Sequence, residues 1–224
     1  MKSQKSRGGK GDRTLGAASL TKERVLRAAV DLADLGGIES LSMRRLGQAL
    51  GVEAMSLYHY VSNKNDLLDS MADFIVSEFA LPSKGSDWKA IIRESAMSAH
   101  AVLWKHPWAC RLKVARPDAG PAALQYIDSI MGCLRRAHFS TQLTHDAHHA
   151  IFSHIYGFTL QELGVRSSIK SLDPEAVAIF LQQMNDRYPY LVEVGRGAKH
   201  DHELEFVFVL DLILDGLEKV RDVS

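Results

Sequence analysis

The 224-residue sequence lacks the features that mark several classes of protein. Its two cysteines, Cys110 and Cys133, are too few for a disulfide framework or a four-thiolate zinc site, which favours reduced thiols in a cytoplasm. No apolar run approaches the roughly 20 residues of a membrane-spanning helix, and the polar N-terminus lacks the apolar stretch of a signal peptide. We therefore expect a globular cytoplasmic protein with no membrane partner.

Sequence motifs of common enzymes are also missing. The chain contains no GxGxxG, GxxxxGK[ST], HExxH or GxSxG motif. A di-iron helical bundle would need Glu-x-x-His pairs on two helices, and the sequence has none. We therefore expect no enzymatic activity and no catalytic residues.

The charge is balanced overall but unevenly distributed. Lysine and arginine number 27, as do aspartate and glutamate, yet residues 1–65 hold 11 basic against 6 acidic residues. A basic front joined to an acidic remainder indicates that the front meets a polyanion. The alternative is that this uneven distribution of charge is a chance feature of a solvated surface.

The apolar residues follow a helical period from Leu20 onward, after a glycine-rich basic segment at 1–19. That segment has too few large apolar residues to order itself, so we expect a disordered basic arm, which either attracts phosphates or only solubilises the chain. No stretch alternates with period two, and the apolar period of 206–220 favours a helix there. The fold class is therefore predicted to be all-α. The first helix is expected to run from its cap, Thr21, to Gly36-Gly37. The second, at 42–50, is expected to bury Leu46, Ala49 and Leu50, and Ser62 is expected to cap the fourth. The predicted helices after the first are 42–50, 54–61, 62–79, 87–105, 121–138, 144–165, 174–187 and 201–221.

Two of these short helices, 42–50 and 54–61, have the layout of a helix-turn-helix joined at Gly51. In the second helix Leu57 and Val61 share an inward face, whereas Met55 and His59 face outward. That outward face carries donors and aromatic rings but no acid, as contact with DNA requires. A core position for Met55 is the alternative.

Three successive blocks make the resemblance specific: 41–52 (LSMRRLGQALGV), 56–61 (SLYHYV) and 63–68 (NKNDLL). Together they closely resemble the DNA-binding domain of the tetracycline-repressor (TetR) family. A generic helical hairpin would not account for the order of all three blocks. The resemblance implies a helix-turn-helix domain at 20–66 and an effector-binding and dimerisation domain at 67–224.

The resemblance also assigns roles in a complex with double-stranded DNA. Arg44 and the outward side chains of the second motif helix, Ala54, Met55 and His59, would read base edges in the major groove. Arginine suits guanine, and Met55 suits thymine methyl groups. Side chains at positions that hold phosphates or sugars are Ser56, Tyr58, Tyr60 and Lys64.

Family members are dimers, so a homodimer on a palindromic operator is implied. Independently, the last helix carries an apolar stripe that further apolar residues widen beyond one face. Such a helix needs two partners, its own core and a second subunit, unless it is a central helix of one chain. The expected interface residues are Phe152, Tyr156, Gly157, Leu210, Ile213 and Leu217.

Four aromatic or imidazole side chains are candidates for contact with a small-molecule effector. His100 with Trp104, and Phe152 with Tyr156, are i,i+4 pairs on helices that the family places around a ligand cavity. Simple core packing is equally consistent with each of them. The resemblance therefore implies a regulator, most simply a repressor that an effector releases from its operator.

A histidine cluster supplies the alternative function. His145, His148 and His149 have the i, i+3 and i+4 spacing that brings two imidazoles to one metal ion. They would suit a helical-bundle metal-binding protein or enzyme, or a divalent ion bound together with the effector. Solvated histidines at the start of a helix are commoner, so we expect no cofactor.

Overall fold

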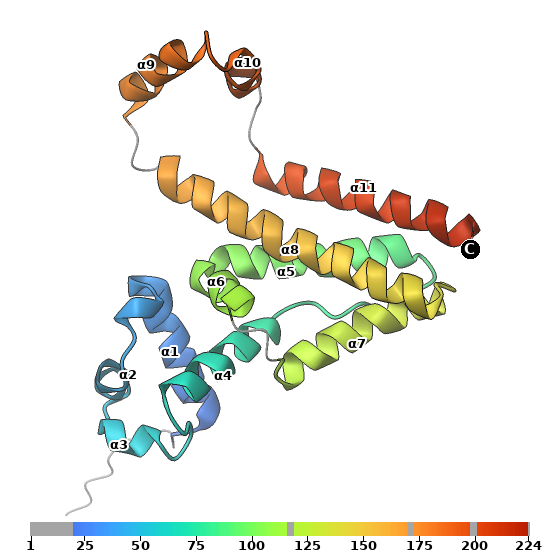
Figure 1. Ribbon diagram of the computed structural model, residues 1–224. Coiled ribbons are helices and arrows are strands. Elements are labelled where there is room, and N and C mark those ends of the chain that lie inside the picture. Colours follow the sequence, from blue (N-terminus) through green and yellow to red (C-terminus); the bar gives the residue numbers. More distant parts are fainter. Residues whose placement is uncertain (1–19, 116–118, 170–172, 198–200, 224) are drawn as a thin grey trace, which may run out of the picture.

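The computed structural model describes residues 20–115, 119–169, 173–197 and 201–223, and the basic arm expected at 1–19 lies outside them. The described residues form helices and connecting segments without a strand, so the predicted all-α class is confirmed. Figure 1 shows the arrangement. The helices are α1 (Lys22–Gly36), the 3-10 turn η1 (Ile38–Ser40), α2 (Met43–Leu50), α3 (Ala54–Leu57), α4 (Lys64–Val76), α5 (Trp88–Lys105), α6 (Pro107–Ala115), α7 (Pro121–Arg136), α8 (Thr141–Ile169), α9 (Pro174–Met184), α10 (Pro189–Gly197) and α11 (His202–Val223).

Side-chain caps set the beginnings of the first helices. The hydroxyl of Thr21 accepts from the Arg24 amide at 3.2 Å, and that of Ser42 accepts from the Arg45 amide at 3.2 Å. Gly51 ends α2 with φ 69°, a left-handed conformation that glycine adopts without strain. These signals confirm the predicted starts of α1 and α2 and the turn between α2 and α3.

Several predicted boundaries in this region are wrong. Helix α3 ends at Leu57 instead of Val61, because the amides of Tyr60 and Val61 both turn back to the Leu57 carbonyl. Asn63, not Ser62, caps α4. Helix α4 ends at Val76, so Phe79 is buried but lies beyond the helix, and Ala49 of α2 is exposed instead of buried.

Two helices were not predicted as such. Helix α6 lies between the predicted helices 87–105 and 121–138 and begins at Pro107, where the missing amide costs no helical hydrogen bond. Helix α10 also begins with a proline, Pro189. Helices α9 and α10 contact each other and lie apart from the main body at the top of Figure 1.

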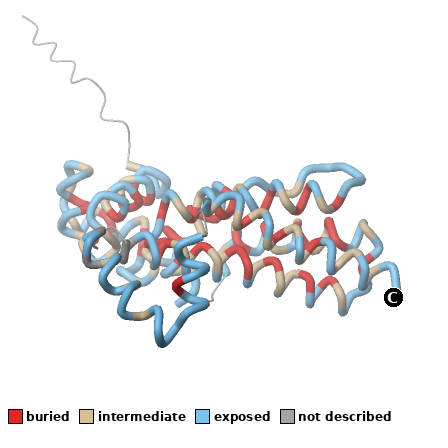
Figure 2. Tube along the Cα trace, turned by 90° about the horizontal axis from the view of Figure 1, so that it is seen from above, coloured by how far each residue is buried: buried red, intermediate tan, exposed pale blue. Residues whose placement is uncertain are grey.

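One hydrophobic core runs from α1 to α11, and the buried segments lie between the helices in Figure 2. The longest helices, α8 and α11, lie side by side. Both cysteines are free and buried, as expected of reduced thiols, and burial raises the pKa of Cys110 to about 11. Among the described residues, no helix is both long and apolar enough to cross a membrane.

Candidate nucleic-acid interface and effector pocket

The helix-turn-helix separates an inner from an outer face as predicted. Leu57 is fully buried and Val61 is 2 % exposed, whereas Met55 is 72 % exposed. A core position for Met55 is therefore wrong. The outer face is free to meet a ligand as large as a duplex.

Five exposed side chains gather around this face, and we call them the recognition surface: Arg44, Met55, Tyr58, His59 and Lys64. Ala54 and Ser56, in the same helix α3, are half-buried. Arg44 makes no hydrogen bond or ion pair within the described part of the chain, while the Arg45 guanidinium donates to the Ser40 carbonyl at 2.9 Å. Of the two arginines, Arg44 is thus the one available to a base.

One acid that was not predicted there lies beside this surface. Glu53 occupies the N-cap position of α3 without a side-chain capping hydrogen bond, and it is exposed. A carboxylate there can accept from the amino group of cytosine. The outward face is therefore not free of acids at its edge.

Tyr60 does not belong to the recognition surface in the way predicted. It is half-buried, and its phenol hydroxyl donates to the Leu20 carbonyl at 2.7 Å. The donor is already used inside the domain, so Tyr60 positions the motif against the start of α1 instead of offering its proton to a phosphate.

The N-terminus of α4 carries a reciprocal cap. The Asn63 side chain accepts from the Asp66 amide at 3.0 Å, and the Asp66 carboxylate accepts from the Ser62 amide at 2.6 Å. That amide hydrogen bond is the main cause that lowers the pKa of Asp66. Because these two amides are already bonded, the expected phosphate contact at this helix end falls mainly to Lys64.

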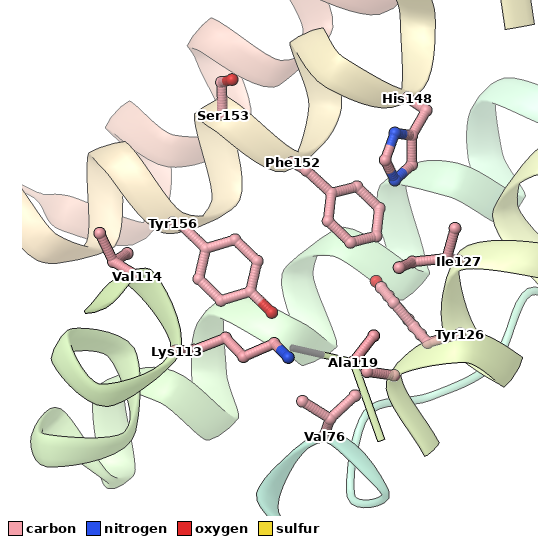
Figure 3. Close-up of a pocket in the computed structure, with 11 residues that line it drawn as sticks. Val76, Lys113, Val114, Ala119, Tyr126, Ile127, His148, Phe152, Ser153 and Tyr156 are labelled. Atoms are coloured by element: carbon pink, nitrogen blue, oxygen red, sulfur yellow. The ribbon is translucent and has the colours of Figure 1, made fainter. Parts of the chain in front are cut away.

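A pocket of about 320 Å³ lies among α4, α6, α7 and α8. Figure 3 shows Phe152 and Tyr156 reaching into it from α8, with Val76 of α4 and Tyr126 of α7 opposite. Both predicted effector residues of α8 therefore line a cavity. The complete lining is Val76, Lys113, Val114, Ala119, Ala123, Tyr126, Ile127, His148, Phe152, Ser153 and Tyr156.

A few polar groups stand among the apolar walls of this pocket. Burial lowers the pKa of His148, with the charges of His149 and His145 adding to the effect, and both of its buried ring nitrogens lack a partner among the described residues. Burial raises the pKa of Tyr156, so its phenol stays protonated. Neutral donors and acceptors and one ammonium group, that of Lys113, in an otherwise apolar cavity suit an organic molecule with a few polar groups. Tyr126 of α7 and Lys113 of α6 were not predicted, because spacing along one helix does not show which other helices border the cavity.

His100 and Trp104 do not join Phe152 and Tyr156 in this pocket. His100 is buried, with its ring stacked on Phe206 at 4.2 Å and 8°. The Thr159 hydroxyl donates to the Ile155 carbonyl at 2.6 Å, so Nδ1 of His100 must donate to Thr159 across 2.7 Å. The other ring nitrogen is left as a buried acceptor without a partner among the described residues.

The predicted interface residues divide between two sides of the long helices. Leu210 is fully buried inside the subunit, and Ile213 and Leu217 are half-buried. Phe152 and Tyr156 face the pocket, whereas Gly157 is exposed with open space around it. The outward apolar side of α11, which sequence analysis did not separate from the inward side, carries Leu204, Phe208, Leu212 and Val220, from 51 to 68 % exposed.

The three clustered histidines of α8 also separate. His148 lines the pocket, while His145 and His149 are exposed, with their Nε2 atoms 3.2 Å apart. Within the described ranges, no group of three or more candidate ligands could hold a metal ion. The alternative of a metal-binding bundle or enzyme is therefore not supported.

Comparison with known proteins agrees with this geometry. Residues 25–71 match the family model of bacterial regulatory proteins of the tetR family, and residues 81–221 match the tetracyclin repressor-like C-terminal domain. The HTH-type transcriptional repressor DrrR1 of Streptomyces coeruleorubidus is 30 % identical over 213 residues, covering 89 % of this chain and 78 % of the relative.

Solved structures show the same fold. A possible TetR family transcriptional regulator from Streptomyces coelicolor A3(2) is 30 % identical with a TM-score of 0.75, over 89 % of this chain and 100 % of that one. The Streptomyces coelicolor protein ActR in complex with actinorhodin has a TM-score of 0.74 at 24 % identity, over 91 % and 99 % of the two chains. The chain therefore belongs to the tetracycline-repressor (TetR) family of DNA-binding transcriptional regulators.

Proposed function

We propose that the protein is a homodimeric repressor that occupies a palindromic operator and leaves it when a small molecule fills the pocket beside α4. One observation carries the proposal: the exposed recognition surface lies at the end of α4 that holds Lys64, and Val76 at the other end lines the pocket. A single rigid helix thus connects the DNA contacts with the ligand site. No catalytic step and no resident cofactor belong to this proposal.

Each part of the recognition surface has its own task in the proposed complex. The Arg44 guanidinium reads guanine, and Met55 packs on a thymine methyl, with Ala54 and His59 beside it. Ser56, Tyr58 and Lys64 bind phosphates or sugars, which fixes the register of the protein on the duplex. One such module covers too little DNA for strong specificity, so two copies are needed.

The second copy is proposed to dock on α8 and α11. The outward residues Leu204, Phe208 and Leu212 of α11 leave an apolar stripe exposed in a single subunit. Contiguous apolar surface of this kind is characteristic of an interaction site. A two-fold axis through this region would place the two recognition surfaces on successive major grooves.

Release by an effector requires that the effector binds the DNA-free arrangement more tightly. Asp73 of α4 accepts hydrogen bonds from the amides of Ala122 and Ala123 at 3.1 and 3.0 Å, so α4 is tied to the start of α7. A molecule that separates α7 from α8 would thereby move α4 and change the spacing of the two recognition surfaces. A coupling of about 1–3 kcal/mol would weaken operator binding roughly 5- to 150-fold.

Footprinting of the purified full chain on its own upstream DNA tests the proposal. We expect one protected region whose two halves are related by two-fold symmetry and lie about one duplex turn apart. Light scattering should give a dimer. A monomer, or equal affinity for every duplex at low ionic strength, would overturn the proposal.

Actinorhodin, which is bound to ActR, is the first effector probe for this chain. The proposal expects actinorhodin to weaken operator binding, and Phe152→Ala, which enlarges the pocket, to change the concentration required. Actinorhodin that binds in the pocket without altering operator affinity would refute the release mechanism while leaving the DNA-binding role intact.

A further inference from the structure

A second and larger cleft lies between the DNA-binding and effector domains. Its volume is about 700 Å³, and it shares no lining residue with the pocket beside α4. One wall comes from α1 and η1, and the other comes from α5, α6 and α8. The lining residues are Ala33, Asp34, Gly37, Ile38, Glu39, Trp104, Lys105, Pro107, Trp108, Arg111, Leu112, Ala115, Leu163 and Arg166.

The effector-domain wall concentrates positive charge next to aromatic rings. Lys105, Arg111 and Arg166 are all exposed and all line the cleft. The guanidinium of Arg166 lies over the Trp104 ring, 5.1 Å from its centroid. An arginine held on an indole is oriented in advance, so it loses less freedom when it binds a carboxylate, sulfonate or phosphate.

The opposite wall carries two acids, but one of them is already committed. The Asp34 carboxylate accepts from the Trp108 indole at 2.6 Å and from the His106 ring at 2.9 Å. Glu39 is the other acid of the lining. Three cations thus share the cleft with two carboxylates, and the net charge of +1 favours an anion near the arginines.

We infer that this cleft binds a small aromatic anion, with its acidic group on Arg111 and Arg166 and its ring system on the apolar floor. That floor is formed by Trp108 together with Ile38, Leu112 and Leu163. Charge-assisted hydrogen bonds to a planar guanidinium give the acidic group its orientation. The site is separate from the proposed effector pocket, since the two share no lining residue.

The position of the cleft gives its ligand a regulatory consequence. A molecule between the two walls touches both domains, so its affinity depends on their relative arrangement. Thermodynamic linkage then requires that bound DNA changes the affinity for the anion by the same factor as the anion changes the affinity for DNA.

A matched pair of dyes tests the site on the full chain. The anionic probe is 8-anilino-1-naphthalenesulfonate, and its neutral counterpart, N-phenyl-1-naphthylamine, has the same aromatic framework without the sulfonate. Two of the three tryptophans, Trp104 and Trp108, line the cleft, so bound dye should quench tryptophan emission. We expect the double variant Arg111→Gln/Arg166→Gln to weaken the anionic dye about tenfold or more and to leave the neutral dye unchanged.

Two further variants guard against misfolding and against binding elsewhere. Glu39→Gln removes the facing negative charge and should tighten binding of the anionic dye while leaving the neutral dye unchanged, whereas a damaged fold that exposes apolar surface would bind more of both dyes. Lys113→Gln makes the matched change in the other pocket and should leave the affinity unaltered. Equal affinity in the wild type and the double arginine variant, or a loss that follows Lys113→Gln instead, would overturn the inference, and neither result bears on operator binding.

Discussion

The phenol hydroxyl of Tyr60 donates a 2.7 Å hydrogen bond to the carbonyl oxygen of Leu20, 40 residues earlier in the chain. This bond joins the segment after α3 to the residue before the cap of α1, and so orients the recognition surface on its domain. We expect Tyr60→Phe to lower the free energy of unfolding by about 1 kcal/mol in urea denaturation, since a partly buried carbonyl loses its donor. The salt dependence of DNA binding should stay as in the wild type; a stable variant with a flatter dependence would instead assign Tyr60 to a phosphate.

Replacing Arg44 or Lys64 with alanine should change DNA binding in two different ways. Arg44→Ala should relax the base preference at one operator position by about 1–3 kcal/mol. Lys64→Ala should weaken binding to all sequences alike and reduce the slope of log affinity against log salt by about 1. Fluorescence anisotropy with a set of single-base operator variants at several salt concentrations measures both effects, and each variant is the control for the other. An unchanged base preference in Arg44→Ala would remove it from the readout.

The exposed stripe of α11 predicts how the dimer can be broken. Phe208 is 65 % exposed in one subunit, so Phe208→Glu should leave the subunit fold intact while placing a charge in the proposed interface. Light scattering should then give a monomer at concentrations where the wild type is a dimer. Leu124→Glu, at a position of similar exposure on α7, is the matched control and should remain dimeric. A dimeric Phe208→Glu variant would move the interface away from α11.

The buried imidazole of His100 predicts acid sensitivity. Burial, reinforced by the charges of His202 and His154, lowers the pKa of His100 from 6.5 to about 4. Below about pH 6.5 the unfolded chain therefore takes up a proton that the folded chain refuses, so the free energy of unfolding falls between pH 6.5 and 4. His100→Gln should flatten this fall, leaving the smaller contributions of His148 and His154, whose pKa values are also lowered. Urea midpoints across this range provide the measurement, and parallel curves for the two proteins would contradict it.

The connection between α4 and α7 leaves no space for a side chain at Gly120. A Cβ there would lie 2.3 Å from Cγ of Asp73, whose carboxylate caps α7. We expect Gly120→Ala to cost about 1–3 kcal/mol because the carboxylate must leave its amides, and Asp73→Ala to cost about 1 kcal/mol as a lost cap. The double variant should cost less than the two single changes together, as a double-mutant cycle by thermal unfolding would show. Strict additivity would mean that the two residues do not meet.

Sequence pattern predicted the features that depend on neighbours along the chain. The caps Thr21 and Ser42, the turn at Gly51 and the opposite faces of Leu57 and Met55 all follow from local spacing. The role of Tyr60 does not follow from local spacing, because the residue that accepts its hydrogen bond, Leu20, lies 40 residues earlier in the chain.

The sequence pattern could not predict features that depend on which helices pack together. The i,i+4 spacing of Phe152 and Tyr156 places them on one face of α8, but periodicity does not tell whether that face meets a cavity or a second subunit. For the same reason Leu210 was predicted to lie in the dimer interface. Helix α11 is apolar on both sides, and only the packing shows that Leu210 faces the core while Phe208 faces outward. Tertiary contact alone also separates His100 from the pocket that holds Phe152.

The ring of Phe206 on α11 is clasped between His100 of α5 and His154 of α8, at 4.2 and 4.5 Å. Nε2 of His154 also lies 2.9 Å from the backbone carbonyl oxygen of Phe206. The rings of His154 and Phe206 therefore cannot slide past each other without breaking this second contact. Three helices are thereby held together, and two of them, α8 and α11, carry the proposed dimer surface. In the proposed dimer, the two packed helix pairs would deform little. The displacement caused by a bound ligand would therefore fall on α4 and not on the interface between the subunits.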